Sequence, residues 1–141
     1  MSLVRPAIID DWEKWNEIDN SLTKDEFKHK VQREHCFILI NNNKIIGVLR
    51  YSLLWDNVPF CNFIKITEDN EHKGFGSILL SRWESIMQET GYDYVMVSTQ
   101  SNESAQHFYR KLGYKDCGGF IIPIVGHEQP LELIFAKDLR Y

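Results

Sequence analysis

The stretch Glu71-His72-Lys73-Gly74-Phe75-Gly76 separates an apolar, β-rich segment from a run with helical periodicity. The preceding segment, Phe60–Thr67, is rich in aromatic and β-branched residues, which favour strands. After Gly76, apolar residues recur at steps of three and four, as on one face of an amphipathic helix; they are Ile78, Leu79, Trp83, Ile86 and Met87. With Gly91 as a C-terminal stop, the pattern predicts a helix over Ser77–Thr90. The chain is organised around this unit of strand, glycine turn (Glu71–Gly76) and helix.

The glycine turn is a candidate binding site for a pyrophosphate. The first N–H groups of a helix lack intrahelical acceptors and lie at the positive end of the helix dipole. Glycines at positions 74 and 76 leave room for a phosphate beside those amides. The alternative is a tight loop before a core helix. The chain lacks the third glycine of a dinucleotide fingerprint and has no Gly-Lys-Ser/Thr P-loop.

Length and composition indicate one globular domain spanning residues 1–141. Hydrophobic residues make up 43% and charged residues 26% of the chain. A net charge of −4, without a dense block of lysine and arginine, argues against a nucleic-acid partner. No apolar run approaches the ~20 residues of a membrane span, and no signal-peptide pattern is present. We therefore expect a cytoplasmic protein that does not bind membranes.

The three cysteines, Cys36, Cys61 and Cys117, are widely spaced and lie in or beside apolar strands. An odd number of cysteines without paired spacing indicates reduced core residues in a cytoplasmic protein. A catalytic cysteine is the alternative.

In the half of the chain before the glycine turn, the sequence predicts a strand, two helices and then two further strands. Leu3–Ile8 is expected to be a strand, followed by a helix that Asp10 or Asp11 caps and that carries Trp12, Trp15 and Ile18. The later expected elements are a charged helix over Asp25–Glu34, a strand over Cys36–Ile40, a turn at Asn41–Lys44, a strand over Ile45–Trp55 with Gly47 as a candidate bulge, and a turn at Asp56–Pro59.

The half after the central helix predicts a buried strand, a helix and a final strand pair. Tyr92–Thr99 is nearly all apolar, as in a strand buried on both faces. In a helix over Asn102–Leu112, one face holds Ala105, Phe108, Tyr109 and Leu112, and Gly113 ends it. Strands over Tyr114–Val125 and Leu131–Leu139 flank a loop at Gly126–Pro130. The strand–helix–strand unit implies a right-handed crossover and one parallel strand pair.

A second motif follows the glycine turn by about thirty residues. The run from Asn102 to Tyr114 has the form Asn-x-x-Ala-x-x-Phe-Tyr-x-x-x-Gly-aromatic. Together with the glycine turn, it resembles the GNAT family of N-acetyltransferases. The opening Val4-Arg5-Pro6-Ala7, followed by Asp10-Asp11, also looks like that family's first strand and helix start. The resemblance covers the whole chain in order.

The resemblance implies the GNAT acyl-CoA N-acyltransferase fold, of α/β (α+β) class. In that fold a mixed, mostly antiparallel sheet of about six to seven strands splays between strands 4 and 5, and about four helices flank it. The implied reaction moves an acetyl group from acetyl-CoA to a primary amine by direct attack in a ternary complex, without a metal. The implied acceptor is a small-molecule or protein amine, and the protein would be a monomer or homodimer.

The family's cofactor contacts map onto residues of this chain. The resemblance places the pantetheine arm of CoA against Ile64, Lys65 and Ile66, and the pyrophosphate on Glu71, His72, Lys73, Gly74, Phe75 and Gly76. Asn102 matches an asparagine that hydrogen-bonds the cofactor arm, although a plain helix N-cap would also explain it. Glu71 departs from the usual Gln or Arg, and an acid repels a diphosphate. We therefore expect Glu71 to point into solvent or to pair with a cation.

Tyr109 matches the family's general acid, and its alternative role is that of a core aromatic. The general base is unassigned, because Phe60 and Val97 are apolar where relatives often carry a base. The remaining candidates are Glu68, Glu103, His107 and His127, and we favour a proton path relayed by water. For the acceptor, Trp55 and Phe60 would supply an apolar contact, and Asn62 could position a water.

Three hypotheses follow. The first is an active acetyl-CoA-dependent N-acetyltransferase. The second, favoured by Glu71 and the missing base, is a GNAT-like sensor or regulatory domain that binds acyl-CoA without turnover. The third is a nucleotide-binding module unrelated to CoA, which rests on the glycine turn alone.

Overall fold

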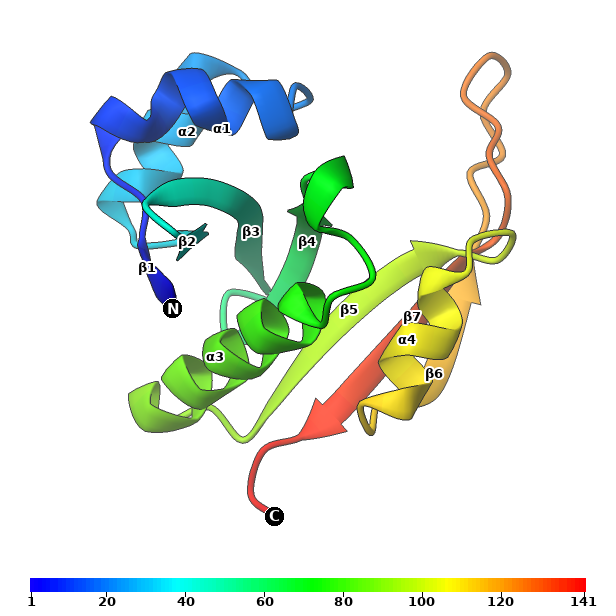
Figure 1. The fold of residues 1–141 in the computed structure, drawn as a ribbon. Coiled ribbons are helices and arrows are strands. Elements are labelled where there is room, and N and C mark those ends of the chain that lie inside the picture. The colour runs from blue at the N-terminus through cyan, green and yellow to red at the C-terminus, as the bar shows by residue number, and fades with distance from the viewer. The chain divides into compact units, whose positions relative to one another are not determined.

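The computed structural model describes residues 1–141 and contains a seven-stranded sheet in the order β1-β2-β3-β4-β5-β7-β6 (Figure 1). The strands are β1 (Ser2–Pro6), β2 (Cys36–Asn41), β3 (Lys44–Leu54), β4 (Val58–Ile66), β5 (Tyr94–Gln100), β6 (Lys115–Phe120) and β7 (Glu132–Asp138). The helices are η1 (Ile9–Asp11), α1 (Trp12–Ile18), α2 (Lys24–Gln32), η2 (Glu68–Asn70), α3 (Phe75–Thr90) and α4 (Ala105–Lys111). The element order and the mixed sheet confirm the predicted fold class.

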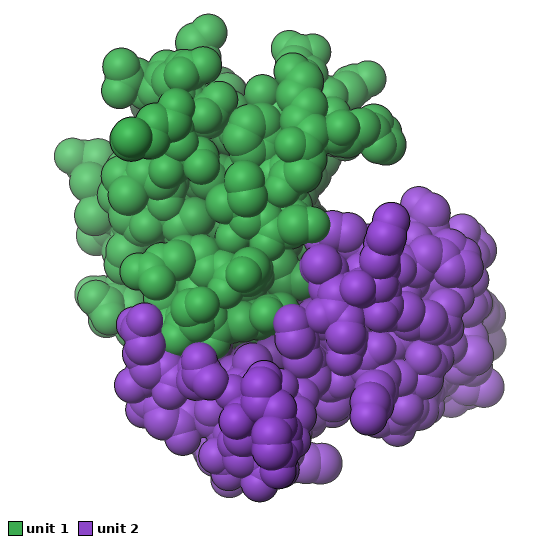
Figure 2. All heavy atoms as spheres, turned by 60° about the horizontal axis from the view of Figure 1, so that its bottom comes forward, with its two compact units in different colours: residues 1–52, 62–86 green, residues 53–61, 87–141 purple.

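The chain forms two compact units, shown in green and purple in Figure 2. Unit 1 comprises Met1–Ser52 and Asn62–Ile86, and unit 2 comprises Leu53–Cys61 and Met87–Tyr141. The boundary passes within β3, β4 and α3, so each unit is built from separate pieces of the chain.

In unit 1, helices cover both faces of the sheet (Figure 1). Helices α1 and α2 place Trp15 and Phe27 on the face that carries Ile38 and Val48, and all four side chains are buried. The opposite face carries Leu39 and Leu49 of β2 and β3, beneath Leu79 and Trp83 of α3. The period of two along the strands assigns alternate residues to opposite faces, and both faces are apolar because each one meets a helix.

The close approach of α3 to the sheet explains the glycine in β3. A Cβ at Gly47 would lie 2.6 Å from Ile66 Cδ1 and 3.4 Å from Leu79 Cδ2. The register against β2 also shifts between Leu39 and Ile40, which confirms a bulge beside Gly47.

Unit 2 holds the parallel pair and the last antiparallel strands. Phe60 and Cys61 of β4 pair in parallel with Met96 and Val97 of β5, which confirms the predicted parallel strand pair. Strand β7 pairs with β5 along its whole length and with β6 on its other side. Helix α4 packs on this sheet, and the connection between β6 and β7 projects beyond the strands (Figure 1).

Several predicted boundaries were wrong. The loop between β6 and β7 covers residues 121–131 instead of Gly126–Pro130, and Ile121, Ile124 and Val125 are exposed in it. Strand β5 begins at Tyr94 and alternates between buried and half-exposed side chains, so it is not buried on both faces. The turn after β3 lies at Trp55 and Asp56, both in the left-handed region, and Pro59 already belongs to β4.

Two side-chain assignments also differ from the prediction. In α3, Leu80 is fully buried and Ile78 is 42% exposed, so the buried face extends toward Leu80. Cys36 and Cys61 are buried as expected, but Cys117 is exposed on β6, and none of the three forms a disulfide. Burial raises the pKa of the Cys36 thiol to about 12, which keeps it protonated and unreactive. None of the α-helices is both long enough and apolar enough to cross a membrane.

Candidate functional site

The glycine turn runs into the first two residues of α3, Phe75 and Gly76, and leaves a row of backbone donors without protein acceptors. The turn is exposed from Glu71 to Gly74, with His72 at φ 61° and Gly74 at φ 84°. Residues 72–76 donate no backbone hydrogen bond; the first bond into the helix is Ile78 N–H to the Gly74 carbonyl, at 3.2 Å. A Cβ at Gly74 would meet nothing within 4 Å. The turn therefore offers free N–H groups, the positive end of a sixteen-residue helix and open space, which together suit a phosphate.

The other predicted cofactor contacts in unit 1 lie on the same continuous segment. Lys65 of β4 is exposed, whereas Ile64 and Ile66 are half-buried. Lys65 and Glu71 line one pocket of about 420 Å³ together with Glu17 and Glu68. Glu71 is exposed and makes no ion pair within the chain, as expected for an acid that avoids a bound diphosphate.

In unit 2, the turn between β5 and α4 is held by Glu103. Its Oε1 accepts hydrogen bonds from the Gln100 N–H at 2.9 Å and from the Thr99 hydroxyl at 3.2 Å. The helix begins only at Ala105, with Ser104 at the N-cap position, so an N-cap role for Asn102 is wrong. Asn102 is exposed in the turn, where its amide is available to a ligand.

Tyr109 lies in an aromatic cluster with its hydroxyl unpartnered. The residue is 5% exposed, and its ring centroid lies 5.5 Å from that of Phe108, 5.7 Å from that of Tyr114 and 5.9 Å from that of Phe135. The hydroxyl makes no hydrogen bond within the chain and is not one of its fully buried polar atoms. Burial raises the pKa of the Tyr109 phenol above its usual value, and Cys61, Glu103 and Glu132 add to this effect. The ring is thus a packed core aromatic whose oxygen still reaches solvent.

The candidate bases have different surroundings. Among them, Glu103 already accepts the two bonds of the β5–α4 turn. Val97, at a position where relatives often carry a base, is apolar and fully buried. Glu68, His107 and His127 are exposed and belong to η2, α4 and the β6–β7 loop, respectively. No group of three or more His, Cys, Asp and Glu side chains is arranged to hold a metal ion.

The candidate acceptor contacts divide between the units. Trp55 is 73% exposed in the β3–β4 turn, and Phe60 is half-buried beside Met96; both belong to unit 2. Asn62 is exposed on the part of β4 that belongs to unit 1. The predicted site residues therefore form two groups. Ile64, Lys65, Ile66, the glycine turn and Asn62 belong to unit 1, and Trp55, Phe60, Asn102 and Tyr109 belong to unit 2.

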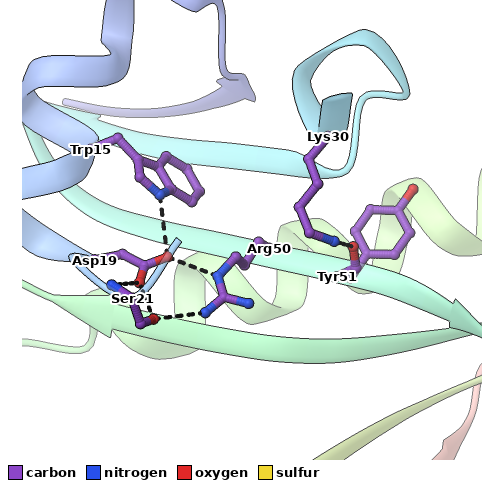
Figure 3. Close-up of polar contacts among 6 residues, drawn as sticks. All are labelled: Trp15, Asp19, Ser21, Lys30, Arg50 and Tyr51. Carbon is purple, nitrogen blue, oxygen red and sulfur yellow. Dashed lines mark hydrogen bonds and ion pairs between the residues drawn. The ribbon is translucent and has the colours of Figure 1, made fainter. Parts of the chain in front are cut away.

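A buried ion pair that the sequence did not reveal fixes the connection between α1 and α2 (Figure 3). The Arg50 Nε donates to Asp19 Oδ2 at 2.8 Å, and its Nη2 donates to the Ser21 hydroxyl at 3.0 Å. The Trp15 indole N–H donates to the same carboxylate at 3.2 Å. Burial alone would raise the pKa of Asp19, but the bonds from Arg50 and Ser21 outweigh it and hold that pKa below its usual value. The loop after α1 is therefore tied to β3.

Comparison with known proteins identifies the family. The model of the acetyltransferase (GNAT) family matches residues 4–114. A search of curated proteins found no match.

Solved structures share the fold at low sequence identity. An N-acetyltransferase from Staphylococcus aureus Mu50 has a TM-score of 0.84 at 17% identity, with 99% of this chain and 98% of that chain covered. The ribosomal-protein-S18-alanine N-acetyltransferase from Escherichia coli has a TM-score of 0.81 at 18% identity, covering 99% and 94%. The PaiA N-acetyltransferase from Thermoplasma acidophilum, solved with coenzyme A, has a TM-score of 0.74 at 17% identity, covering 98% and 99%. The family match over most of the length, together with this shared fold, shows that the chain belongs to the GNAT family of acetyltransferases.

Proposed function

We propose that the protein transfers an acetyl group from acetyl-CoA to a primary amine by direct attack in a ternary complex. One observation carries the proposal: in a chain of the GNAT family, the glycine turn presents unpaired N–H groups and open space at the N-terminus of α3. Such a site binds phosphate without any charged side chain.

The residues available for acetyl-CoA fit its parts. The glycine turn would hold the pyrophosphate through its amides, with Lys73 adding a positive charge. The backbone at Ile64, Lys65 and Ile66 and the exposed amide of Asn102 would hold the pantetheine arm. Acetyl-CoA supplies the activated thioester. The protein has to orient the two substrates, remove a proton from the amine and supply one to the departing thiolate.

Tyr109 would supply the proton that the departing thiolate receives. Its raised pKa keeps the phenol protonated at every working pH, and its unpartnered hydroxyl is free to donate. A phenol near pKa 10 is a weaker acid than a thiol near about 8.5, and burial widens that gap. We therefore expect a hydrogen bond to the developing thiolate charge, with full proton transfer linked to the proton that the attacking nitrogen loses.

The amine has to lose a proton before it attacks. An alkylammonium with a pKa of about 10.4 is neutral in roughly one molecule in 2,500 at pH 7. Val97 offers no proton acceptor and Glu103 is engaged by the turn, which favours a path relayed by water. The acceptor would contact Trp55, Phe60 and Asn62. Both a protein amine, as the name of the ribosomal-protein-S18-alanine N-acetyltransferase indicates for that enzyme, and a small-molecule amine fit this reaction.

A non-catalytic acyl-CoA sensor is the second candidate, favoured by Val97 and Glu71. Thiol release from acetyl-CoA, measured across a panel of peptide N-termini, polyamines and aromatic amines, separates the two functions. We expect release with at least one amine. Binding of acetyl-CoA by calorimetry without release for any amine would favour the sensor. Preferential binding of ATP or NAD over CoA would overturn both.

A further inference from the structure

Unit 1 contains a second pocket, of about 750 Å³, on the hairpin side of the glycine turn. Its walls come from three elements that are distant in sequence: α1, the β2–β3 hairpin and the loop between β4 and α3. Each wall contributes one lysine; these are Lys14, Lys44 and Lys73. We call this the lysine pocket.

The charge of the lysine pocket is positive in a chain whose net charge is −4. Lys44 and Lys73 are exposed and make no ion pair within the chain. Lys14 pairs with Glu17 at 3.1 Å, a partner on its own helix that does not line the pocket. Asp69 is the single acid among the lining residues. The balance favours an anionic ligand, because three ammonium groups face a single carboxylate and two of them have no ion-pair partner.

The rest of the lining is polar and able to donate hydrogen bonds. Asn42 and Asn43 form the hairpin turn in the left-handed conformation, at φ 52° and 64°, and both line the pocket. Asn70 of the loop between β4 and α3 also lines the pocket, and its side-chain amide donates to the Thr67 hydroxyl at 2.9 Å. Lysine ammonium and amide N–H groups can both donate hydrogen bonds to the oxygens of a phosphate monoester.

The lysine pocket and the glycine turn share Lys73 and the loop that precedes it. A ligand whose pyrophosphate lies on the turn therefore brings its neighbouring groups to the mouth of the pocket. In CoA, the ribose that carries the pyrophosphate at its 5′ position carries a phosphate monoester at its 3′ position. That group bears roughly −1.5 to −2 charges at pH 7.

We propose that the lysine pocket binds a phosphate monoester and that this group is the 3′-phosphate of CoA, held by Lys44, Lys73 and Lys14. The inference rests on the proposed function, since it places a further part of the same cofactor. It makes the β2–β3 hairpin, which is remote in sequence from the glycine turn, a determinant of cofactor choice.

The test compares the dissociation constants of CoA and 3′-dephospho-CoA for the wild type and for Lys44→Gln. We expect the wild type to bind dephospho-CoA about tenfold more weakly, as for the loss of one charge-assisted contact. In Lys44→Gln this ratio should fall to about threefold, while the affinity for dephospho-CoA stays unchanged. Lys24→Gln, an equal charge change on the exposed start of α2, should keep the wild-type ratio. The ratio should also shrink at high salt, because an exposed contact is screened.

Each other outcome counts against the inference. Equal affinity of the wild type for the two ligands would overturn it and leave the proposed function standing, whereas a failure of both ligands to bind would remove both. A Lys44→Gln variant that loses affinity for the two ligands alike would show a structural effect. Inorganic phosphate that perturbs the Lys44 NMR signals, while CoA does not, would assign the pocket to free phosphate instead.

Discussion

Tyr109 combines a packed aromatic ring with an unpartnered hydroxyl. Its ring packs against Phe108, Tyr114 and Phe135, as the helical spacing of apolar residues predicted for a core aromatic. Its hydroxyl nevertheless has no protein partner, so the fold does not use the group that we propose as the proton donor. The two roles can therefore be separated by removing one atom.

The substitution Tyr109→Phe should lower kcat by about 10²-fold, the usual scale for one positioned proton donor. The melting temperature and the dissociation constant for acetyl-CoA should barely change, because the ring and its contacts remain. Steady-state kinetics, thermal melts and calorimetry on the same variant measure the three quantities.

Only the kinetic result separates packing from chemistry. Tyr109→Ala should cost roughly 3–5 kcal/mol of stability in either case, as other large-to-small core changes do. If kcat of Tyr109→Phe equals that of the wild type with chemistry rate-limiting, the tyrosine has no chemical role and solvent is the proton source.

Gly74 and Gly76 test the glycine turn at the same scale. Gly76 lies within α3 without a positive φ, so Gly76→Val adds a side chain beside the free amides without left-handed strain. We expect this variant to remain folded and to lose measurable CoA binding in a calorimetric titration. Gly74→Val should also lose binding, but its φ of 84° adds strain and lowers the melting temperature.

Glu71→Gln is the matched comparison, because it changes charge without adding bulk. It should tighten CoA binding by removing repulsion from the diphosphate. Unchanged CoA affinity in a folded Gly76→Val protein would contradict the assignment of the turn.

At the scale of elements, the spacing of apolar residues predicted a helix or strand correctly where those residues pack against another element. The glycine turn, α3 and the β2–β3 hairpin are correct to within about two residues. The strand expected over Tyr114–Val125 was too long because its later apolar residues face solvent in the β6–β7 loop. Alternation and hydrophobicity do not reveal whether a neighbouring strand exists to pair with. Leu80 of α3 is buried although it falls outside the predicted apolar face. The spacing of apolar residues does not show how much of a helix surface its neighbours cover.

Contacts between distant elements had no sequence signal. Asp19 and Arg50 are 31 residues apart, and the lysines of the lysine pocket come from three different elements. By contrast, the glycine turn and Tyr109 belong to local motifs, which is why the sequence could nominate them. Charged residues at wide spacing look like ordinary surface until the fold brings them together.

The Asp19–Arg50 pair should make stability depend on pH in the acid range. The pKa of Asp19 is lower in the folded chain than the unfolded value of about 3.9. The pair's contribution is therefore complete above about pH 4 and is lost as pH falls through the lower folded pKa. Urea unfolding from pH 7 to pH 2 should show this loss.

The substitution Asp19→Asn should remove that part of the pH dependence. It should also cost about 3 kcal/mol at pH 7, because it leaves Arg50 unpaired in a largely buried position. Asp138→Asn is the control, since Asp138 pairs with Arg140 at the exposed surface and should matter little. A pH profile of Asp19→Asn parallel to that of the wild type would show that the pair is not responsible.

At the scale of the whole molecule, neither compact unit is one continuous piece of chain. The chain first enters unit 2 at Leu53–Cys61 and then returns to unit 1 for Asn62–Ile86. It enters unit 2 again at Met87. Because β3, β4 and α3 each contribute to both units, we propose that the chain is a single folding domain.

Scanning calorimetry should then give one transition with equal calorimetric and van't Hoff enthalpies. Two resolved transitions, or a van't Hoff enthalpy well below the calorimetric value, would show that the units unfold separately.

The central claim is that acetyl passes directly from acetyl-CoA to an amine. The most direct measurement follows free thiol, acetylated amine and intact protein mass together, with and without the best amine of the panel. The account expects thiol and acetylated amine in equal amounts, thiol release only when amine is present, and no acetylated protein. Cys36 and Cys61 are buried and the Cys36 thiol stays protonated, so no covalent intermediate is expected on them. A burst of thiol without amine, accompanied by an acetylated protein, would contradict direct transfer.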